Sequence, residues 1–136
     1  MVGPDPRSQG GMATVIRIVL DAGYGQDGKA EFIATQSDGG QALKLWTLLR
    51  SSGRFVFLLL TQKVAGLHAH VSSGVSFWRK GLFIALTRLF GRPVIFHLHG
   101  GNFIAFIRSL SGVRRRMALW IIQQSQLAYA LTEESR

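Results

Sequence analysis

The spacing of hydrophobic and polar positions along the chain predicts strands alternating with helices. Short apolar runs, each typical of a buried strand, fall at residues 30–35, 65–71, 94–98 and 127–131. Longer stretches with amphipathic, helical spacing fall between and before them, at residues 12–20, 41–50, 76–90 and 113–126. Such alternation is typical of an α/β fold, a Rossmann-like parallel sheet with helices on both faces.

Three further features complete this prediction. Ser51-Ser52-Gly53 is expected to end the helix over 41–50, and the apolar residues 54–63 are assigned to a second helical piece. The short apolar stretch over 103–110 is expected to cover the site. Only residues 1–3 precede the first loop, so the chain is expected to begin inside a truncated first strand.

The helix over 76–90 is expected to bury one stripe of side chains and to expose another. Its buried stripe is assigned to Leu82, Phe83, Leu86, Leu89 and Phe90. Its polar side is assigned to Arg79, Lys80 and Arg88.

Composition restricts the class of protein. The 136 residues are 47% hydrophobic and include three tryptophans, which indicates one domain with a real core rather than a disordered chain. The absence of cysteine excludes a disulfide framework, a thiolate metal site and a cysteine nucleophile. No apolar run approaches the ~20 residues of a membrane span, and the N-terminus lacks the apolar core of a signal peptide. We therefore expect a cytoplasmic protein, either free or peripheral on the inner face of the plasma membrane.

The charge balance predicts anionic partners. Sixteen Lys and Arg against seven Asp and Glu give a net charge of +9. Every acidic residue lies near one of the two ends, and residues 39–132 contain none. This stretch therefore holds no carboxylate pair for acid–base catalysis or for Mg²⁺. Nucleic acid is not expected, because the aromatic residues lie on buried stripes and are not interleaved with basic residues.

Candidate chemistry gathers at the predicted carboxyl edge of the sheet. The segment PVIFHLHGGNF reads as a buried strand that delivers His99 to its C-terminal end, where two glycines turn the backbone. Ligands of parallel α/β sheets bind outside this edge. The loops after two other strands meet the same edge, so the candidate binding residues are Gly10, Gly11, Ser72, Ser73, Gly100, Gly101 and Asn102.

Four histidines occur as two pairs, His68 with His70 and His97 with His99. On a strand, this spacing puts both members of a pair on one face. Two interpretations are open: a metal site built from imidazole nitrogens, or histidines that pack through hydrogen bonds. We favour packing for His68 and His97 near the boundary between sheet and helices, place His70 and His99 nearer the ligand edge, and assign no metal. His99 is the catalytic candidate.

Basic residues form two further groups. Arg79 and Lys80 lie early in the helix over 76–90, close to the ligand edge. Arg114, Arg115 and Arg116 open the helix over 113–126, where cations oppose the helix dipole. The triple arginine is either a site for phosphate or anionic lipid or a solvated basic face, and both interpretations are open.

Three segments together resemble the N-terminal domain of family 4 glycosyltransferases of the GT-B fold, of the bacterial surface-polysaccharide type. PDPRSQGGMATV is similar to their first glycine-rich loop. LHAHVSSGVSFWRKGLFIALTRLFGRPVIFHLHGGNF resembles their core, and LAYALTEESR resembles their last N-terminal strand and the residues after it. The combination of Gly-Gly, Ser-Phe-x-Arg-Lys and His-x-His-Gly-Gly carries the resemblance.

The resemblance implies a retaining transferase that moves a hexose from a nucleotide-sugar to a polysaccharide or polyprenyl-phosphate-linked acceptor, without a metal or other cofactor. His99 would reach the donor sugar, and Gly10 and Gly11 would line the donor-phosphate or acceptor cleft. Arg79 and Lys80 would face an acceptor phosphate or the membrane. The resemblance also adds Thr132 and Glu133, just past the last strand, to the binding residues.

The chain departs from the family pattern in one important respect. The acidic pair Glu-x₇-Glu, which belongs to the second GT-B domain, does not occur here. We therefore expect residues 1–136 to form an incomplete acceptor-side domain, inactive alone. Two other functions stay open: a non-catalytic basic domain that binds anionic membrane or phosphorylated lipid, and a metal-dependent hydrolase built on the four histidines.

Overall fold

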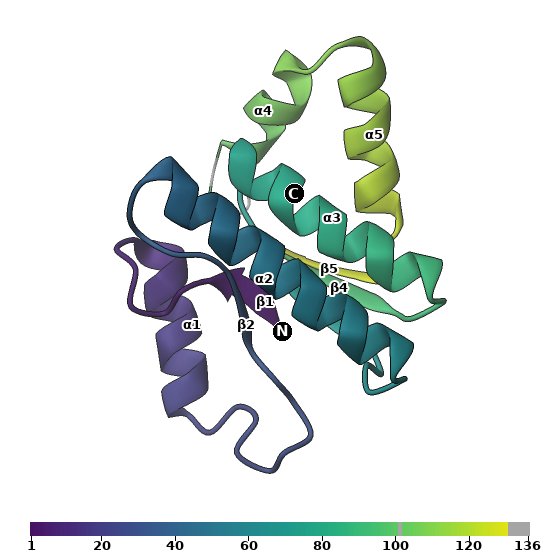
Figure 1. Cartoon of the computed structure of the whole chain (residues 1–136). Coiled ribbons are helices and arrows are strands. Elements are labelled where there is room, and N and C mark those ends of the chain that lie inside the picture. Colours follow the sequence, from purple (N-terminus) through teal and green to yellow (C-terminus); the bar gives the residue numbers. More distant parts are fainter. Residues whose placement is uncertain (101, 131–136) are drawn as a thin grey trace.

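The computed structural model, which describes residues 1–100 and 102–130, is an α/β fold with a five-stranded parallel sheet (Figure 1). The strand order is β2-β1-β3-β4-β5, and all neighbouring pairs are parallel. This confirms the predicted Rossmann-like architecture. The strands are β1 (Val2–Pro4), β2 (Ile33–Gln36), β3 (Leu67–Val71), β4 (Val94–Leu98) and β5 (Leu127–Ala130).

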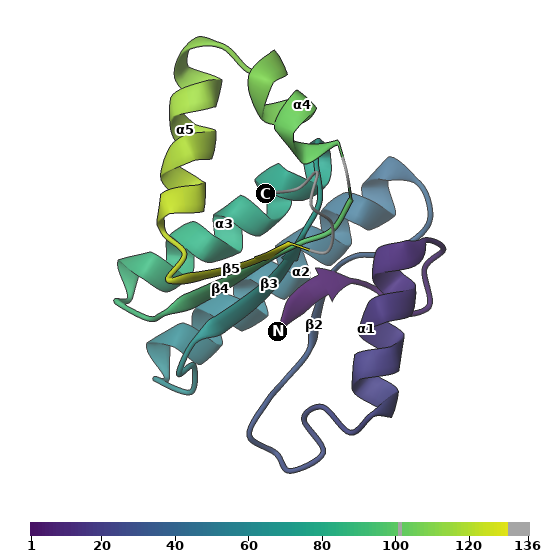
Figure 2. The same ribbon diagram turned by 180° about the vertical axis from the view of Figure 1, so that it is seen from behind.

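Helices lie on both faces of the sheet, but unequally. The helices are α1 (Gly11–Asp21), α2 (Gln41–Leu60), α3 (Val75–Leu89), α4 (Phe103–Ser109) and α5 (Gly112–Gln123). Figures 1 and 2, seen from opposite sides, show α2 and α3 on one face of the sheet and α1 on the other. The helices α4 and α5 pack against α3, so more helices lie on the α2–α3 side of the sheet than on the α1 side.

The core lies between the sheet and the α2–α3 layer. Alternate residues of β3 and β4 face this layer and are buried, among them Ala69, Val71, Val94 and Phe96. From the helices, Phe55, Leu59, Phe77, Phe83 and Ile84 fill the same core. Because strand side chains alternate between faces, the histidines of these strands must lie on the opposite side.

That opposite face, which also carries α1, is largely open at β5. Its register pairs Ile95 with Leu127 and His97 with Tyr129. Leu127 and Tyr129 are exposed, 45% and 51% respectively. Figure 2 shows β3, β4 and β5 on this side, with α1 lying beside β1 and β2 rather than over β5. The histidine-bearing face is therefore accessible to solvent near its outer strand.

The prediction of a helix break at residues 51–53 was wrong, because α2 continues through them to Leu60. Ser51 is buried, and its hydroxyl donates to the Leu48 carbonyl oxygen at 3.0 Å. Gly53 has open space around its Cα, so nothing there interrupts the helix. Burial of Phe55 and Leu59 one and two turns later outweighs the weak local propensity of the three small residues.

The predicted faces of α3 also need correction. Leu82 and Phe90 are partly exposed and Leu89 is 79% exposed, whereas Lys80 is buried. The side that faces the core carries Phe77, Gly81, Phe83, Ile84 and Thr87 together with Lys80. The prediction relied on the largest apolar residues of the helix. It left out the small and polar residues, which also lie on the buried side.

Among the described residues, no helix combines the length and the apolarity required to cross a bilayer.

Candidate functional site

The ends of β3 and β4 bring predicted site residues to one edge of the sheet. The His99 amide donates to the Val71 carbonyl oxygen at 2.7 Å, which extends the pairing of the two strands by one residue. Ser72 and Ser73, both half-buried, follow β3 directly. Gly100 turns the chain with φ of 99°, a conformation that favours glycine. The sequence prediction that His99 and these serines share an edge is consistent with this geometry.

The glycine loop after β1 reaches the same edge. Gly10 has φ 121° and ψ 158°, and Gly11 is the first residue of α1. The Asp38 carboxylate accepts a hydrogen bond from the Gln9 amide at 3.0 Å, one residue before this glycine. An acidic side chain therefore lies next to the glycine loop, where the sequence led us to expect an anionic ligand. Sequence reasoning missed Asp38, although the turn at residues 37–40 places it at the end of the neighbouring strand.

His68, His70, His97 and His99 form one continuous group of imidazole rings, which we call the histidine cluster. His70 and His97 are direct neighbours in the parallel register. Ring centroids lie 4.6 Å apart for His68–His70, 4.8 Å for His70–His97 and 4.4 Å for His97–His99. The spacing predicted a shared face within each pair, and the register places both pairs on the same face.

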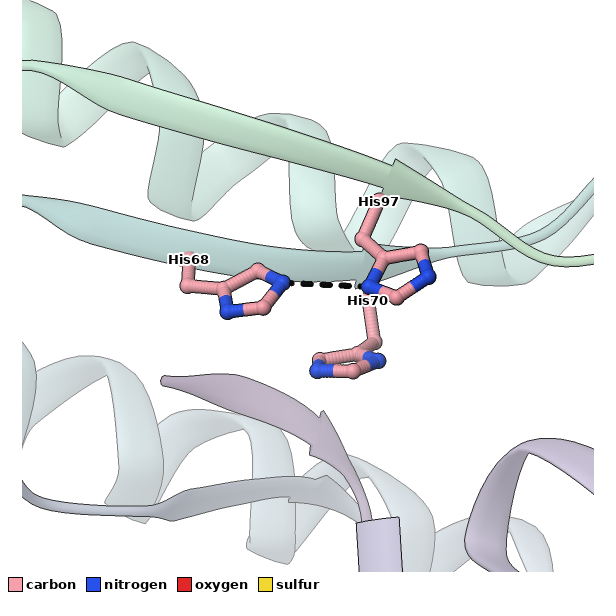
Figure 3. A group of neighbouring side chains, drawn as sticks. All are labelled: His68, His70 and His97. Carbon is pink, nitrogen blue, oxygen red and sulfur yellow. Dashed lines mark hydrogen bonds between the residues drawn. The ribbon is translucent and has the colours of Figure 1, made fainter. Parts of the chain in front are cut away.

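Hydrogen bonds link the cluster across the two strands. His68 Nε2 lies 3.2 Å from His97 Nδ1, as Figure 3 shows, and His70 Nδ1 lies 2.7 Å from His99 Nε2. His70 Nε2 is in turn 2.9 Å from Met1 Sδ. Within the described residues, His97 Nε2 is buried and has no hydrogen-bond partner. His68 and His97 therefore pack by hydrogen bonding, but on the face away from α2 and α3 rather than beneath a helix.

The surroundings keep the cluster neutral. Burial first, and then the neighbouring imidazoles, lower the pKa of His68 to about 4 and that of His99 to about 4. The pKa of His70 falls to about 2, first through burial and then through its histidine neighbours and the N-terminal amine. Burial also lowers the pKa of His97. At neutral pH these rings carry lone pairs rather than charge, so they can accept protons, hydroxyl hydrogens or a metal ion.

The two cations of α3 occupy unexpected positions. Lys80 is 1% exposed, and its ammonium donates to Ser76 Oγ at 3.2 Å. Burial first, and then the neighbouring Arg79 charge, lower its pKa to about 8. Arg79 is half-buried and donates to Gln36 Oε1 at the end of β2. The prediction that Lys80 faces an acceptor phosphate or the membrane does not fit this position, because its side chain is buried.

Arg114, Arg115 and Arg116 are exposed at the start of α5. This helix packs on α3, where Ile121 lies over Gly81, on the side of the sheet away from the histidine cluster. A groove of about 500 Å³ runs between the two helices. Its lining is apolar apart from one arginine: Trp78, Gly81, Leu82, Ala85, Arg116, Met117, Trp120 and Ile121. The triple arginine is thus separate from the edge that carries His99.

The remaining predicted residues give little further detail. Asn102 is exposed at the start of α4, where its side chain makes no capping hydrogen bond. Gly101, Thr132 and Glu133 lie outside the described residues. A cavity of about 780 Å³, which sequence reasoning missed, lies instead beside β2 and α2, lined in part by Asp5, Arg7, Asp38, Trp46 and Arg54. No motif in these segments indicated it, because the lining residues come from four separate stretches.

The edge at His99 offers a neutral imidazole, two serine hydroxyls and a glycine turn, a combination that can hydrogen-bond a polyhydroxylated ligand. The opposite layer offers an apolar groove beside arginines. Comparison of this chain with protein-family models, with curated proteins and with solved structures found no match in any of the three.

Proposed function

We propose that this chain is the acceptor-side, Rossmann-like domain of a retaining, nucleotide-sugar-dependent glycosyltransferase. The observation that carries the proposal is the position of His99 at the end of β4, beside Ser72 and ahead of a glycine turn. Parallel sheets bind their ligands outside this edge. The resemblance in the segments around Gly10, Ser76 and His99 supplies the class of reaction.

In this function His99 is the catalytic residue that contacts the donor sugar. His70 Nδ1 lies 2.7 Å from His99 Nε2, which orients the His99 ring, and in this proposal His99 Nδ1 binds a sugar hydroxyl. The lowered pKa keeps the ring neutral at pH 7, so it acts as a hydrogen-bonding group rather than a cation. Ser72 and Ser73 supply further hydroxyls for the acceptor. The nucleotide would be held by the second domain of the GT-B fold.

The test measures ligand binding by the 136-residue chain with saturation-transfer NMR. Nucleoside-diphosphate hexoses and a polyprenyl-phosphate headgroup analogue are the probes. We expect the wild-type chain to bind these probes weakly. Binding should be lost in His99→Ala and retained in Tyr129→Phe, and none of the three proteins should transfer sugar. Sugar transfer by the isolated chain would contradict the half-enzyme proposal, and binding that His99→Ala leaves intact would contradict the assigned site.

A second function, a basic domain that binds anionic membrane, is favoured by the groove between α3 and α5. Met117 is 51% and Trp120 48% exposed there, beside the three arginines of α5. Apolar side chains next to arginines suit the boundary between acyl chains and anionic headgroups. The two functions are compatible, and vesicle binding by His99→Ala separates them, because only the transferase site needs His99.

A further inference from the structure

We propose that His68, His70 and His97 form a binding site for one zinc ion, a site that does not depend on the proposed transferase function. Figure 3 shows the three side chains projecting to the same side of β3 and β4. One ring nitrogen from each lies within 4.8 Å of the others. Imidazole nitrogens are ordinary zinc ligands, and three histidines with one open position are a known zinc arrangement.

The distances fit a small ion after modest side-chain rotation. Zinc–nitrogen bonds of about 2.0–2.1 Å in a tetrahedron put the ligand atoms about 3.4 Å apart. His68 Nε2 and His97 Nδ1 are already 3.2 Å apart. His70 is the third ligand, and the rigid pairing of β3 with β4 holds its Cα opposite that of His97. Only the rings, and not the backbone, need to move for all three to reach one ion.

The chemistry of the cluster also favours a metal. Zinc binds only unprotonated imidazole, and an imidazole with the ordinary pKa of about 6.5 is largely unprotonated at neutral pH.

His99 has a different part in this site. Its Nε2 hydrogen-bonds His70 Nδ1, so it is a positioning residue that orients the His70 ring, as outer histidines or carboxylates orient metal ligands elsewhere. Met1 Sδ lies against His70 Nε2 and must move if that nitrogen binds the ion. Three neutral imidazole ligands would leave the bound zinc with its positive charge and with a fourth position open to water or an anion.

The test uses the full chain purified without a histidine tag and stripped with a chelator. Calorimetric titration with Zn²⁺ is expected to give one ion per chain, and Co²⁺ is expected to give the visible absorption of a tetrahedral site. His68→Gln and His97→Gln each should weaken zinc binding at least tenfold, whereas His99→Gln should have a smaller effect. Tyr129→Phe, which keeps the ring against His97, is the matched control and should bind normally.

Three results would overturn the proposal: no zinc binding by the stripped chain, unchanged binding in the His68→Gln/His97→Gln double variant, or six-coordinate Co²⁺ spectra. Circular dichroism of each variant shows whether it is folded. His68 and His97 are only half-buried, so their replacement is compatible with folding. Ring-proton NMR of the wild type supplies a readout without any variant, because zinc should shift the His68, His70 and His97 signals together.

Discussion

His70 and His97 lie directly opposite each other on β3 and β4, with ring centroids 4.8 Å apart. Each also stacks on a histidine of its own segment, His68 and His99 respectively. Protonation of any one ring therefore raises the cost of protonating the others, in addition to the cost of burial. This coupling makes the histidine cluster sensitive to acid, and it determines the first prediction.

Acidification is expected to destabilise the protein between pH 6.5 and about 4. The folded pKa values lie below the ordinary value of 6.5, so in this window the unfolded chain binds protons that the folded chain does not. The contribution of these neutral histidines to the free energy of unfolding is fully present above pH 6.5 and is lost as the pH decreases. For the buried His70 and His99, the loss by pH 5 is about 2 kcal/mol each. Urea unfolding in the presence of chelator, at pH 7 and pH 5, measures this loss in the free energy of unfolding.

The control for this prediction is Tyr129→Phe, which leaves all four imidazoles and should keep the full pH dependence. A His70→Asn/His99→Asn double variant should lose most of it. The N-terminal amine, whose pKa is lowered to about 6 by burial, adds a smaller loss of the same sign. A free energy of unfolding that is flat from pH 7 to pH 5 would contradict the buried, neutral cluster.

Gly10 and Gly11 are expected to respond very differently to alanine. Gly10 has φ of 121° and ψ of 158°, a region almost restricted to glycine, so Gly10→Ala should cost about 1–3 kcal/mol. Gly11 begins α1 at a φ that any residue adopts, with open space around it, so Gly11→Ala should be neutral or slightly stabilising. Thermal unfolding of both variants decides the matter. Equal effects at the two positions would show that the loop conformation is not the one described.

Local pattern predicted the strand over 94–98 with the bounds that the structure has, because a short, mostly apolar run is followed closely by a glycine turn. The same reasoning could place His97 and His99 on one face. It could not predict that His70 would be the partner of His97, since register between strands depends on the turns and helices that separate them. The histidine cluster is therefore a property of the tertiary structure, visible in the sequence only as two separate pairs.

The continuous helix α2 leads to a prediction about its central glycine. Gly53 is exposed in mid-helix with nothing near its Cα, so Gly53→Ala should stabilise the protein by about 1 kcal/mol through helix propensity alone. Gly81 of α3 is the matched comparison, because an added Cβ would lie 2.7 Å from Ile121 Cδ1. Overpacking should make Gly81→Ala less stable than Gly53→Ala by at least about 1 kcal/mol. Denaturant unfolding compares the two, and a destabilising Gly53→Ala would argue against one continuous helix.

Lys80 shows where sequence reasoning reaches its limit. A lysine beside an arginine on an amphipathic helix is normally assigned to the solvent side. In the structure Gly81 instead packs closely against Ile121 of α5, and Lys80 lies among the buried residues of α3. Neither neighbour in the sequence indicates this burial.

Replacing Lys80 by methionine is expected to stabilise the protein at pH 7 by about 1–3 kcal/mol, since a similar volume is kept and a buried charge is removed. The folded pKa of about 8 lies below the ordinary 10.5, so the unfolded chain binds the extra proton between them. Wild-type stability should therefore rise from pH 8 to pH 10.5, and the advantage of the variant should shrink. Lys63→Met, at an exposed position, should change stability by less than about 0.5 kcal/mol. An advantage of Lys80→Met that persists at pH 10.5 would mean that the pKa of Lys80 is not lowered on folding, so that removal of a buried charge is not its cause.

The final prediction concerns the groove between α3 and α5. The wild-type protein should sediment with vesicles that contain anionic phospholipid, and little of it should sediment with vesicles of zwitterionic lipid. Each arginine near an anionic surface contributes about 1 kcal/mol, so replacing Arg114, Arg115 and Arg116 by glutamine should weaken binding about a hundredfold. Trp120→Ala should weaken it separately by removing an exposed aromatic side chain from the groove. His99→Ala, on the other side of the sheet, is the control and should bind vesicles like the wild type. If the triple variant also binds like the wild type, the three arginines are a solvated basic face and not a membrane-binding site.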